Sequence, residues 1–569
     1  MKKTTRTLLL VLALVVVLSI GVFATWNQYQ GNSYHNGQIT DTTPPPISPS
    51  PTVTTAPLKA AGSGWSGVDT TPLMETYDET TYAYVTYNGW AEGTQLSCIN
   101  CNDATRSWTR KISLTNGVNQ LSTPYLDDTN GIIYVAATNY YWFLQNPEFR
   151  TTQKWTLNGN AAITVGSSDD TSYVTIPNGD SISQTFNSTT SGTISTQLTS
   201  AIKLVSSGTN AKVTYTLSRP NGTTAEWEET ITSATDWHYI EYVGTGYVNS
   251  TGTYTMTVSV SDADVIIDYV SFSHQTTGIQ AYNRDGTVNR SNVAKATYGG
   301  QINTPLTVYG NYLYFGTYNG QYKYYQVDLT NVDTSTNTKC FTGHSHFYWA
   351  GAYADNTYVY FGGDGGYLYR QPVAHFDDTS TTYGSAEWAL SGAGNIRSSI
   401  CYDNGNLYFT SQGGYLWRFN IANETSVKAY IGSSTSRGSS TSTPAISSSG
   451  YVYVGSYGNT YKGIFKIDKN FNNNTSMTQL LDANSNEQNP ITILPVQASV
   501  IIYTSNGTDY IFFTTNMAGG SGYCYSCANN GFSVSKIWSA GSGWTLQGMA
   551  ACDGYVTFGN DSNKFYIIH

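Results

Sequence analysis

Short strands with aromatic and aliphatic residues at every other position recur along most of this chain. Residues 442–459 read STPAISSSGYVYVGSYGN, in which a short strand, a turn and a second alternating strand follow one another. A period of two is the pattern of a half-buried antiparallel strand, and Gly or Asn in the turn supplies the positive φ of a tight hairpin. Similar hairpins are predicted at residues 122–139, 303–320, 351–365 and 398–413.

The spacing of these hairpins predicts the architecture. An aromatic residue of the second strand returns every 45 to 59 residues, with one gap of 180, at Tyr84, Tyr134, Tyr314, Tyr360, Tyr408, Tyr453, Phe512 and Phe558. A period in the mid-forties with about four strands per repeat is typical of β-propeller blades. We therefore predict an all-β chain with an eight-bladed propeller; seven blades are the alternative count. Residues 548–569 and an N-terminal strand would form the last blade and leave no open sheet edge.

The blade sequences resemble the quinoprotein-like repeat of pyrroloquinoline-quinone alcohol dehydrogenases and of the outer-membrane assembly lipoprotein propeller. The matching pieces are the hairpins above, a third segment ending in Trp at residues 96–108 and 522–538, and the opening WNQYQGNSYHNG at residues 26–37. In the dehydrogenases, a disulfide between adjacent cysteines, a stacking Trp and a calcium site hold the quinone. This chain has no adjacent cysteines, so the resemblance implies the scaffold only, and neither the quinone nor another organic cofactor is expected.

The gap of 180 residues indicates a second domain inserted in blade two. Residues 146–155 read NPEFRTTQKW, residues 174–186 read VTIPNGDSISQTF, and residues 265–273 read VIIDYVSFS. This order resembles the galactose-binding-like β-sandwich jelly rolls that serve as carbohydrate-binding modules. The predicted organisation is a signal peptide at 1–24, a propeller-closing segment at 25–39, a Pro/Thr-rich linker at 40–62, propeller at 63–144, the jelly roll at 145–275, and propeller again at 276–569.

Composition and the N-terminus indicate export. Charged residues make up 11% of the chain, against about 25% in average proteins. The net charge is −10, and no run of Lys or Arg follows residue 6, so nucleic acid is not an expected partner. A basic start, an apolar run and a small residue at Ala24 predict cleavage before Thr25; an uncleaved membrane anchor is the alternative. Either way, we predict an extracellular or cell-surface location.

The jelly-roll resemblance implies a sugar site and a calcium site. Trp227, flanked by Glu226 and Glu228, is the candidate aromatic platform for a sugar ring. Family members often hold calcium with the Glu of an N-P-G-F-E motif and an Asp near the end. Here Arg150 stands in the Glu position, whereas Asp268 is kept, so the implied calcium site lacks one ligand.

Two histidines and two further side chains are the candidate site residues of the propeller. His344 and His346 are two residues apart before the first strand of blade four, so on a strand they would share a face and could bind one metal ion. The alternative is a pair of solvated loop histidines. Trp349 and Arg397 fall near the channel side of their blades and are candidate ligand contacts.

Cysteines and sequons suggest covalent features of an exported protein. The C-x-x-C pairs Cys98/Cys101 and Cys524/Cys527 are predicted to form local disulfides, with zinc as the alternative. N-glycosylation sequons, in numbers that chance alone would give, occur at Asn187, Asn221, Asn249, Asn289, Asn423, Asn473, Asn474, Asn506 and Asn560.

These patterns lead to one functional hypothesis and two alternatives. The hypothesis is a non-catalytic, exported binding or scaffold protein, whose propeller displays a glycan-binding jelly roll and whose partner is a glycan or a cell-surface protein. The first alternative is a self-associating structural subunit of a surface layer or filament, for which low charge and abundant Tyr, Thr and Asn are suitable. The second is an enzyme, either a quinoprotein oxidoreductase or a polysaccharide-active hydrolase.

Overall fold

The protein is all-β in a computed structural model of the chain. The structure describes residues 25–58, 67–68, 70–88, 94–112, 121–166, 172–189, 194–290, 293, 301–318, 322–331, 337–458, 460–482, 494–516, 521–541, 543, 545–561 and 564–569. Their one helical element is the short 3₁₀ helix η4 (Thr381–Tyr383). Within these ranges, no helix has the length and apolar character needed to cross a membrane. The predicted signal peptide lies outside the described residues.

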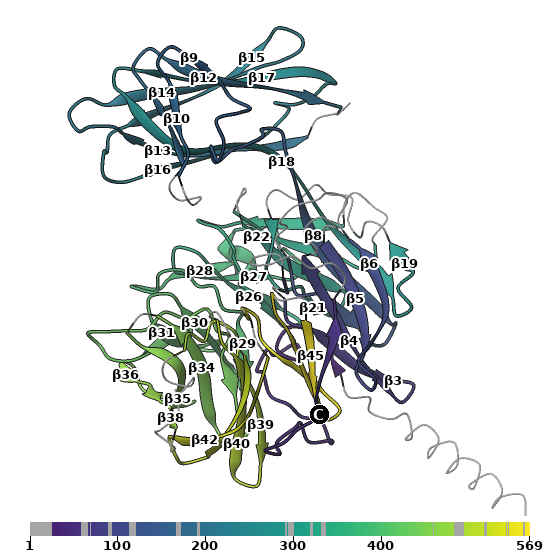
Figure 1. The fold of residues 1–569 in the computed structure, drawn as a ribbon. Coiled ribbons are helices and arrows are strands. Elements are labelled where there is room, and N and C mark those ends of the chain that lie inside the picture. Colours follow the sequence, from purple (N-terminus) through teal and green to yellow (C-terminus); the bar gives the residue numbers. More distant parts are fainter. Residues whose placement is uncertain are drawn as a thin grey trace, which may run out of the picture.

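Eight sheets, here called units 1 to 8, repeat the predicted hairpin pattern in chain order, and their strands are antiparallel except for β36 in unit 5 and β38 in unit 7 (Figure 1). Unit 1 has β1 (Thr25–Trp26), β3 (Leu73–Tyr77), β4 (Thr80–Asn88), β5 (Thr94–Asn100) and β6 (Thr105–Lys111). Unit 2 has β7 (Tyr125–Asp127), β8 (Ile132–Trp142), the second half of β18 (Val265–Asn283) and β19 (Val288–Arg290). Unit 3 has β20 (Gln301–Ile302), β21 (Thr307–Tyr309), β22 (Tyr312–Tyr318), β23 (Lys323–Asp328) and β24 (Thr338–Thr342). Unit 4 has β25 (Tyr353–Ala354), β26 (Tyr358–Gly363), β27 (Tyr367–Pro372) and β28 (Ala386–Ala389).

The second half of the series has the same plan. Unit 5 has β29 (Cys401–Asp403), β30 (Asn406–Ser411), β31 (Tyr415–Asn420), β32 (Thr425–Tyr430) and β36 (Thr475–Ser476). Unit 6 has β33 (Ala445–Ile446), β34 (Tyr451–Tyr457), β35 (Lys462–Asp468) and β37 (Thr478–Gln479). Unit 7 has β38 (Leu481–Asp482), β39 (Ile501–Ser505), β40 (Thr508–Thr514), β41 (Gly522–Ala528) and β42 (Ser533–Ala540). Unit 8 has β43 (Ala550–Cys552), β44 (Tyr555–Gly559), β45 (Lys564–Ile568) and the N-terminal strand β2 (Val53–Pro57).

Each unit buries both faces of its sheet against its neighbours. In β26, Tyr360 belongs to the core shared with unit 5, whereas the adjacent Phe361 belongs to the core shared with unit 3. This arrangement follows from the alternation of side chains along a strand. The last core joins Phe512 of unit 7 and Phe558 of unit 8 to Val85 of unit 1, so the series closes on itself as a ring.

The segment predicted as a linker supplies the strand that closes the ring. β2 pairs with β45 along its whole length, from Val53 opposite Ile568 to Pro57 opposite Lys564. Upstream, the carbonyl of Pro46 accepts a hydrogen bond of 2.6 Å from the Trp538 indole. The prediction of a poorly packed linker at 40–62 is therefore wrong for residues 40–58. Proline and threonine were misleading because an outer strand tolerates Pro at its end.

The N-terminal segment, residues 25–42, occupies the inside of the ring instead of forming its closing strand. Its backbone bonds with successive inner strands: Leu126 donates to the carbonyl of Asn27, Tyr402 to that of Tyr34, Ile446 to that of Asn36 and Ile502 to that of Gly37. Tyr29, His35 and Ile39 are buried. The segment therefore fills much of the channel that the inner strands surround.

Hydrogen bonds to Ser and Thr hydroxyl groups link the inner strands of several neighbouring units. The backbone N–H of Ser399 donates to Thr443 Oγ1 at 2.9 Å, and that of Thr443 donates to Ser499 Oγ at 2.8 Å. Thr71 and Thr123 make the same contact between units 1 and 2 at 3.2 Å. In units 2, 5, 6 and 7, the Ser or Thr before the inner strand thus accepts a hydrogen bond from the backbone of the preceding unit. Tyr29 of the N-terminal segment bonds to Ser499.

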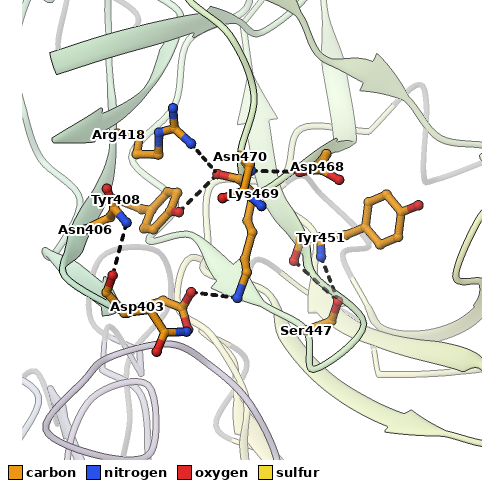
Figure 2. A network of polar contacts seen from close by, with 10 residues as sticks. Asp403, Asn406, Tyr408, Arg418, Ser447, Tyr451, Asp468, Lys469 and Asn470 are labelled. Atoms are coloured by element: carbon orange, nitrogen blue, oxygen red, sulfur yellow. Dashed lines mark hydrogen bonds and ion pairs between the residues drawn. The ribbon is translucent and has the colours of Figure 1, made fainter. Parts of the chain in front are cut away.

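Polar contacts also join neighbouring units at the other end of their inner strands (Figure 2). Between units 5 and 6, Lys469 Nζ lies 2.8 Å from Asp403 Oδ2, and its carbonyl accepts hydrogen bonds from Tyr408 and Arg418. Between units 6 and 7, the buried Lys466 donates to the carbonyls of Ala528, Asn529 and Gly531 at 2.8–3.1 Å. A buried amine without hydrogen-bond acceptors is energetically costly. The bonds of Lys466 therefore hold the two units at a fixed distance from each other.

A two-layered sandwich leaves the ring between β8 and β18 (Figure 1). One layer has the order β10 (Ala162–Thr164), β11 (Tyr173–Ile176), β18, β13 (Ser195–Leu204) and β16 (His238–Thr245). The other has β15 (Thr224–Ile231), β14 (Ala211–Ser218), β17 (Gly252–Ser261), β12 (Ser181–Ser188) and β9 (Thr156–Asn158). β18 is continuous from the sandwich into unit 2, where it pairs with β8. The two parts are therefore joined by uninterrupted strand pairing.

Candidate functional site

The structure corrects the predicted sugar platform of the sandwich. Trp227 has 7% of its surface exposed and packs in the core against Tyr247, with ring centroids 4.8 Å apart. Glu226 and Glu228 are exposed on the opposite face of β15, and Glu228 pairs with Lys212 at 2.7 Å. Neighbouring residues of a strand point to opposite faces, so the two acids cannot flank the Trp227 ring. Trp227, Glu226 and Glu228 do not form a site together.

A different aromatic group lies on the outer face of the sandwich. Tyr239 of β16 is 69% exposed, and its cross-strand partner on β13 is Ala201. On its other side, Ala201 pairs with Tyr269 of β18, so the two tyrosines flank one small residue on a common face. Ala201 is itself fully buried although it points outward. We call the side chains of Tyr239, Ala201 and Tyr269 the tyrosine face.

A cation and polar residues extend the tyrosine face. Trp237 is half-buried two residues before Tyr239, and Lys203 Nζ lies 4.6 Å from the centre of its ring. Thr199 and Ser271 are opposite one another in the neighbouring row of the same face. Sequence reasoning missed Tyr239 because the segment DWHYIEY alternates aromatic and polar residues on both faces. The signal that could have found it is Ile240, the most apolar residue of the segment. If Ile240 faces the core, the adjacent Tyr239 must face outward.

The predicted calcium ligand Asp268 occupies a β-bulge. β13 pairs Ala201 with Tyr269 but Ile202 with Ile267, so Asp268 is the extra residue of β18. Glu148, near the start of the sandwich, forms an ion pair with Arg150. Within the described ranges, no three His, Cys, Asp or Glu side chains gather as metal ligands. Calcium binding at Asp268 therefore stays a prediction.

Trp349 and Arg397, two of the predicted site residues, both lie at the end of the channel nearest the sandwich. Arg397 makes a bidentate ion pair with Asp364, at 2.9 and 2.7 Å, and its guanidinium lies 4.6 Å from the centre of the Tyr348 ring. The Tyr348 and Trp349 rings are 4.6 Å apart. Trp349 has φ +57°, a conformation that a bulky residue rarely adopts and that often marks a functional position.

Among the described residues, little free space is left in the channel at this end. Trp349, Arg397 and Tyr29 line a hollow of about 20 Å³ on the ring axis, which is roughly the space of one water molecule. A ligand larger than a water molecule would therefore contact the surface of this cluster. Because Asp364 already neutralises Arg397, the exposed edges of the aromatic rings are the groups left for such a contact.

The structure does not bring His344 and His346 together as the predicted metal pair. They lie in a bent loop, where residues two apart do not share a face as they would on a strand. His344 Nε2 lies 3.0 Å from Glu387 Oε1, whereas the His346 ring packs against Tyr318 and Tyr322. Burial lowers the pKa of His346, with Asp364 acting against the shift.

The predicted disulfides are wrong. All seven cysteines lie in the described part of the chain, and none of them forms a disulfide. Cys98 faces the core between units 1 and 2, and Cys101 faces the core between units 8 and 1. Cys524 and Cys527 are likewise in two different cores. The spacing of three places the two thiols of each pair on opposite faces of a sheet, where no disulfide can form.

Eight of the nine sequons have an exposed asparagine. Asn560 is the exception, because only 1% of its surface is exposed. A glycan needs an accessible side chain, so the prediction of a glycosylation site is wrong for Asn560. Glycosylation at the exposed residues stays a prediction, and these are Asn187, Asn221, Asn249, Asn289, Asn423, Asn473, Asn474 and Asn506.

Comparisons with known proteins give distant likenesses to solved structures. No protein-family model matches the chain, and no curated protein matches it. BamB from Moraxella catarrhalis is 11% identical, with a TM-score of 0.37, over 52% of this chain and 81% of BamB. A second likeness is to TmCBM61, solved in complex with β-1,4-galactotriose: 16% identity and a TM-score of 0.20, over 23% of this chain and 97% of that one.

A third likeness is to the CBM22-1 xylan-binding domain of Xyn10C from Paenibacillus barcinonensis. It is 15% identical, with a TM-score of 0.18, over 24% of this chain and 92% of that domain. At these low identities and TM-scores, the three likenesses say nothing about the ligand of this chain. Function is inferred below from the chain's own residues.

Proposed function

We propose that this is a non-catalytic, exported glycan-binding protein of the cell surface, in which an eight-bladed β-propeller carries an inserted jelly roll. Units 1 to 8 would be the blades, and the sandwich would be the jelly roll. The closed series of cores supports the propeller, and the paired β8 and β18 support the insertion within blade two. In this reading, the ring is the platform and the sandwich presents the ligand surface.

The tyrosine face is the observation that carries the proposed activity. Tyr239 is exposed to 69%, the largest value among the exposed bulky apolar residues of the described chain. Tyr239 lies on the edge strand β16 and, with Tyr269 and the nearby Trp237, belongs to a group of aromatic residues of the kind that marks an interaction site. Aromatic rings present an apolar face and a polar rim, which suits the C–H face and the hydroxyl groups of a sugar.

The neighbours of Tyr239 favour an uncharged or weakly acidic glycan. Lys203 is the cation nearest to the aromatic group, and it already lies over the Trp237 ring. Thr199 and Ser271 add hydroxyl groups on the same face. Strands hold Lys203, Thr199 and Ser271, so little conformational entropy is lost on binding. The expected ligand is a chain of several sugar residues lying along the sheet.

A glycan array with the full-length exported chain tests this proposal. Tyr239→Ala should abolish binding to the glycans that the unchanged protein retains, because it removes the exposed ring and nothing from the core. Tyr383→Ala, which removes another exposed tyrosine from the ring part, is the matched control and should bind as before. Equal binding by both variants, or no binding of any glycan by the unchanged protein, would contradict the proposal.

A further inference from the structure

Two cations contact the same aromatic ring at the surface of unit 5. Lys428 Nζ of β32 lies 4.4 Å from the centre of the Tyr415 ring, and the guanidinium carbon of Arg437 lies 4.8 Å from it. Among the described residues, no other ring has two cations over it. Tyr415 itself is buried in the core between units 4 and 5. We call Lys428 and Arg437 the basic patch.

The charges of the basic patch are not neutralised by acidic side chains. Arg284 and Arg397 of the ring each form an ion pair with a carboxylate, whereas neither Lys428 nor Arg437 forms an ion pair with a described residue. Residues 425–467 contain no Asp or Glu, although the chain has 37 acidic and 27 basic residues. The patch is therefore a local excess of positive charge in an acidic protein.

Backbone carbonyls hold both cations in position at the surface. Arg437 is exposed; its Nε donates to the carbonyl of Gly413 at 3.0 Å, and its Nη1 donates to that of Ser434 at 2.8 Å. Lys428 Nζ donates to the carbonyl of Ser391 at 3.2 Å. Arginine has five N–H donors and lysine three. Both N–H groups of Arg437 Nη2 and two of Lys428 Nζ are therefore left without an acceptor among the described residues.

The chemistry of the basic patch defines the class of ligand. Two cations held close together repel each other, and an anion that contacts both of them removes this repulsion. Because their positions are already fixed by the carbonyls and by the Tyr415 ring, little conformational entropy is lost on binding. Ser434 and Thr435, next to the Arg437 guanidinium, are exposed and carry hydroxyl groups. A ligand that has both anionic and hydroxyl groups matches this surface.

We propose that the basic patch binds the carboxylate or sulfate groups of an acidic polysaccharide. Arg437 donates to one anionic group through Nη2, Lys428 contacts the same group or the next one along the chain, and the hydroxyl groups of Ser434 and Thr435 bond to sugar hydroxyls. The anionic character of the ligand follows from the residues of the patch. Only the choice of a saccharide rests on the proposed function.

The basic patch lies at the end of the ring that carries the sandwich. β8 runs through unit 2 toward the sandwich (Figure 1), and β30 is the equivalent second strand of unit 5. The turn after β30, residues 412–414, therefore lies at the same end, and Arg437 bonds to the carbonyl of Gly413 within it. A long polysaccharide can thus reach the ring and the sandwich from one end of the molecule.

Calorimetric titration of the full-length protein with oligogalacturonate and with chondroitin sulfate oligosaccharides tests the basic patch and distinguishes carboxylate from sulfate. At about 0.1 M salt, which screens distant charges, at least one of them should bind, and the affinity should fall as salt is added. Arg437→Gln and Lys428→Gln should each raise the Kd about tenfold, whereas Arg437→Lys and Lys428→Arg keep the charge and should retain most of the affinity. Arg219→Gln, which removes a carbonyl-bound cation from the sandwich, is the control.

The outcomes separate the basic patch from the tyrosine face. If the two Gln variants weaken binding of an acidic oligosaccharide and Tyr239→Ala does not, the patch is established, whatever the glycan array shows. If Tyr239→Ala removes all binding and the Gln variants change nothing, the patch is wrong and the proposed function stands. Binding of neither acidic ligand, or an equal loss in the variants that keep the charge, would also overturn the patch. So would equally tight binding of polyglutamate, because a saccharide would then not be needed.

Discussion

The ring and the sandwich use their sheets in different ways. In the ring, adjacent residues of one strand, such as Tyr360 and Phe361, are both fully buried because both faces of the sheet are covered. In the sandwich, each sheet has one covered face, so Trp227 is buried while its neighbour Glu228 is exposed. The same alternation of side chains thus gives two buried faces in the ring and one buried face in the sandwich. The difference depends on whether one or both faces of the sheet are covered by other elements.

This difference explains where ligand contacts can occur in each part. A ring unit has no free sheet face, so its functional groups are limited to the ends of the ring and to the N-terminal segment inside it. Trp349, Arg397 and the basic patch lie at the end nearest the sandwich. The sandwich keeps free outer faces, and on one of these Tyr239 is exposed.

The largest effect that separates the two faces of the sandwich is expected at Trp227. Trp227→Ala removes a buried indole and should lower the free energy of unfolding by about 3–5 kcal/mol. Tyr239→Ala removes an exposed ring and should change it by less than about 0.5 kcal/mol. Urea unfolding followed by fluorescence measures both values. Similar losses of stability in the two variants would mean that the faces have been assigned incorrectly.

Acid should act on the inside of the ring more than on the sandwich. Burial lowers the pKa of His35 to about 4, with the backbone of Ile400 acting against the shift. The unfolded chain, with a pKa near 6.5, binds this proton first, so stability is full above about pH 6.5 and falls as the pH decreases toward 4. The expected loss at pH 4 is about 3 kcal/mol.

A variant isolates this contribution from that of the carboxylates. His35→Gln should lower stability at pH 7 but should lose about 3 kcal/mol less than the unchanged protein between pH 7 and pH 4. Urea midpoints at the two pH values give the comparison, and His238→Gln in the sandwich, an exposed histidine, is the control. If His35→Gln and the unchanged protein lose stability in parallel, His35 is not the buried neutral group described above.

The sequence could predict the ring better than it could predict the sites. The eight second-strand aromatics at a period in the mid-forties, from Tyr84 to Phe558, are all buried. A repeat is a strong signal because each copy reports the same local packing. By contrast, alternation shows that Trp227 and Glu228 face opposite sides but not which side is inward. That choice depends on β13 and β17, which come from other parts of the chain.

The N-terminal segment could not be predicted for a related reason. Its bonds to Leu126, Tyr402 and Ile502 join residues that are far apart in sequence, and the segment has no period of its own. The closing strand β2 was hidden by its Pro and Thr content, although its pairing with β45 is regular. Trp349 and Arg397 were found because their places in the repeat lie near the channel. Tyr348, which joins them, gave no separate signal.

A moderate loss of stability is expected when the ion pair of Arg397 at the end of the ring is removed. The side chain of Asp364 is 8% exposed, and Arg397 is its bidentate partner. Arg397→Ala leaves that carboxylate buried without its cation and should lower the free energy of unfolding by about 2 kcal/mol. Lys339→Ala removes an exposed ion pair with Asp377 and should change it by less than about 0.5 kcal/mol. Equal effects in chemical denaturation would show that the Arg397 cluster is no more than a surface pair.

The smallest expected effect concerns the buried cysteines, whose positions test whether both faces of a ring sheet are covered. Cys98 and Cys101 lie in two different cores, and burial raises the pKa of Cys98 to about 12. Dithiothreitol should therefore leave the Tm unchanged, whereas a reducible disulfide would typically contribute about 2–4 kcal/mol. A thiol reagent should react slowly with the native protein and should count seven thiols after unfolding. Cys98→Ser serves as the control and should lower the count by one. Five thiols or fewer in the unfolded chain, with the bond mapped to one C-x-x-C pair by peptide analysis, would place that pair on one face of its sheet, and the two-sided burial of the ring units would then be wrong.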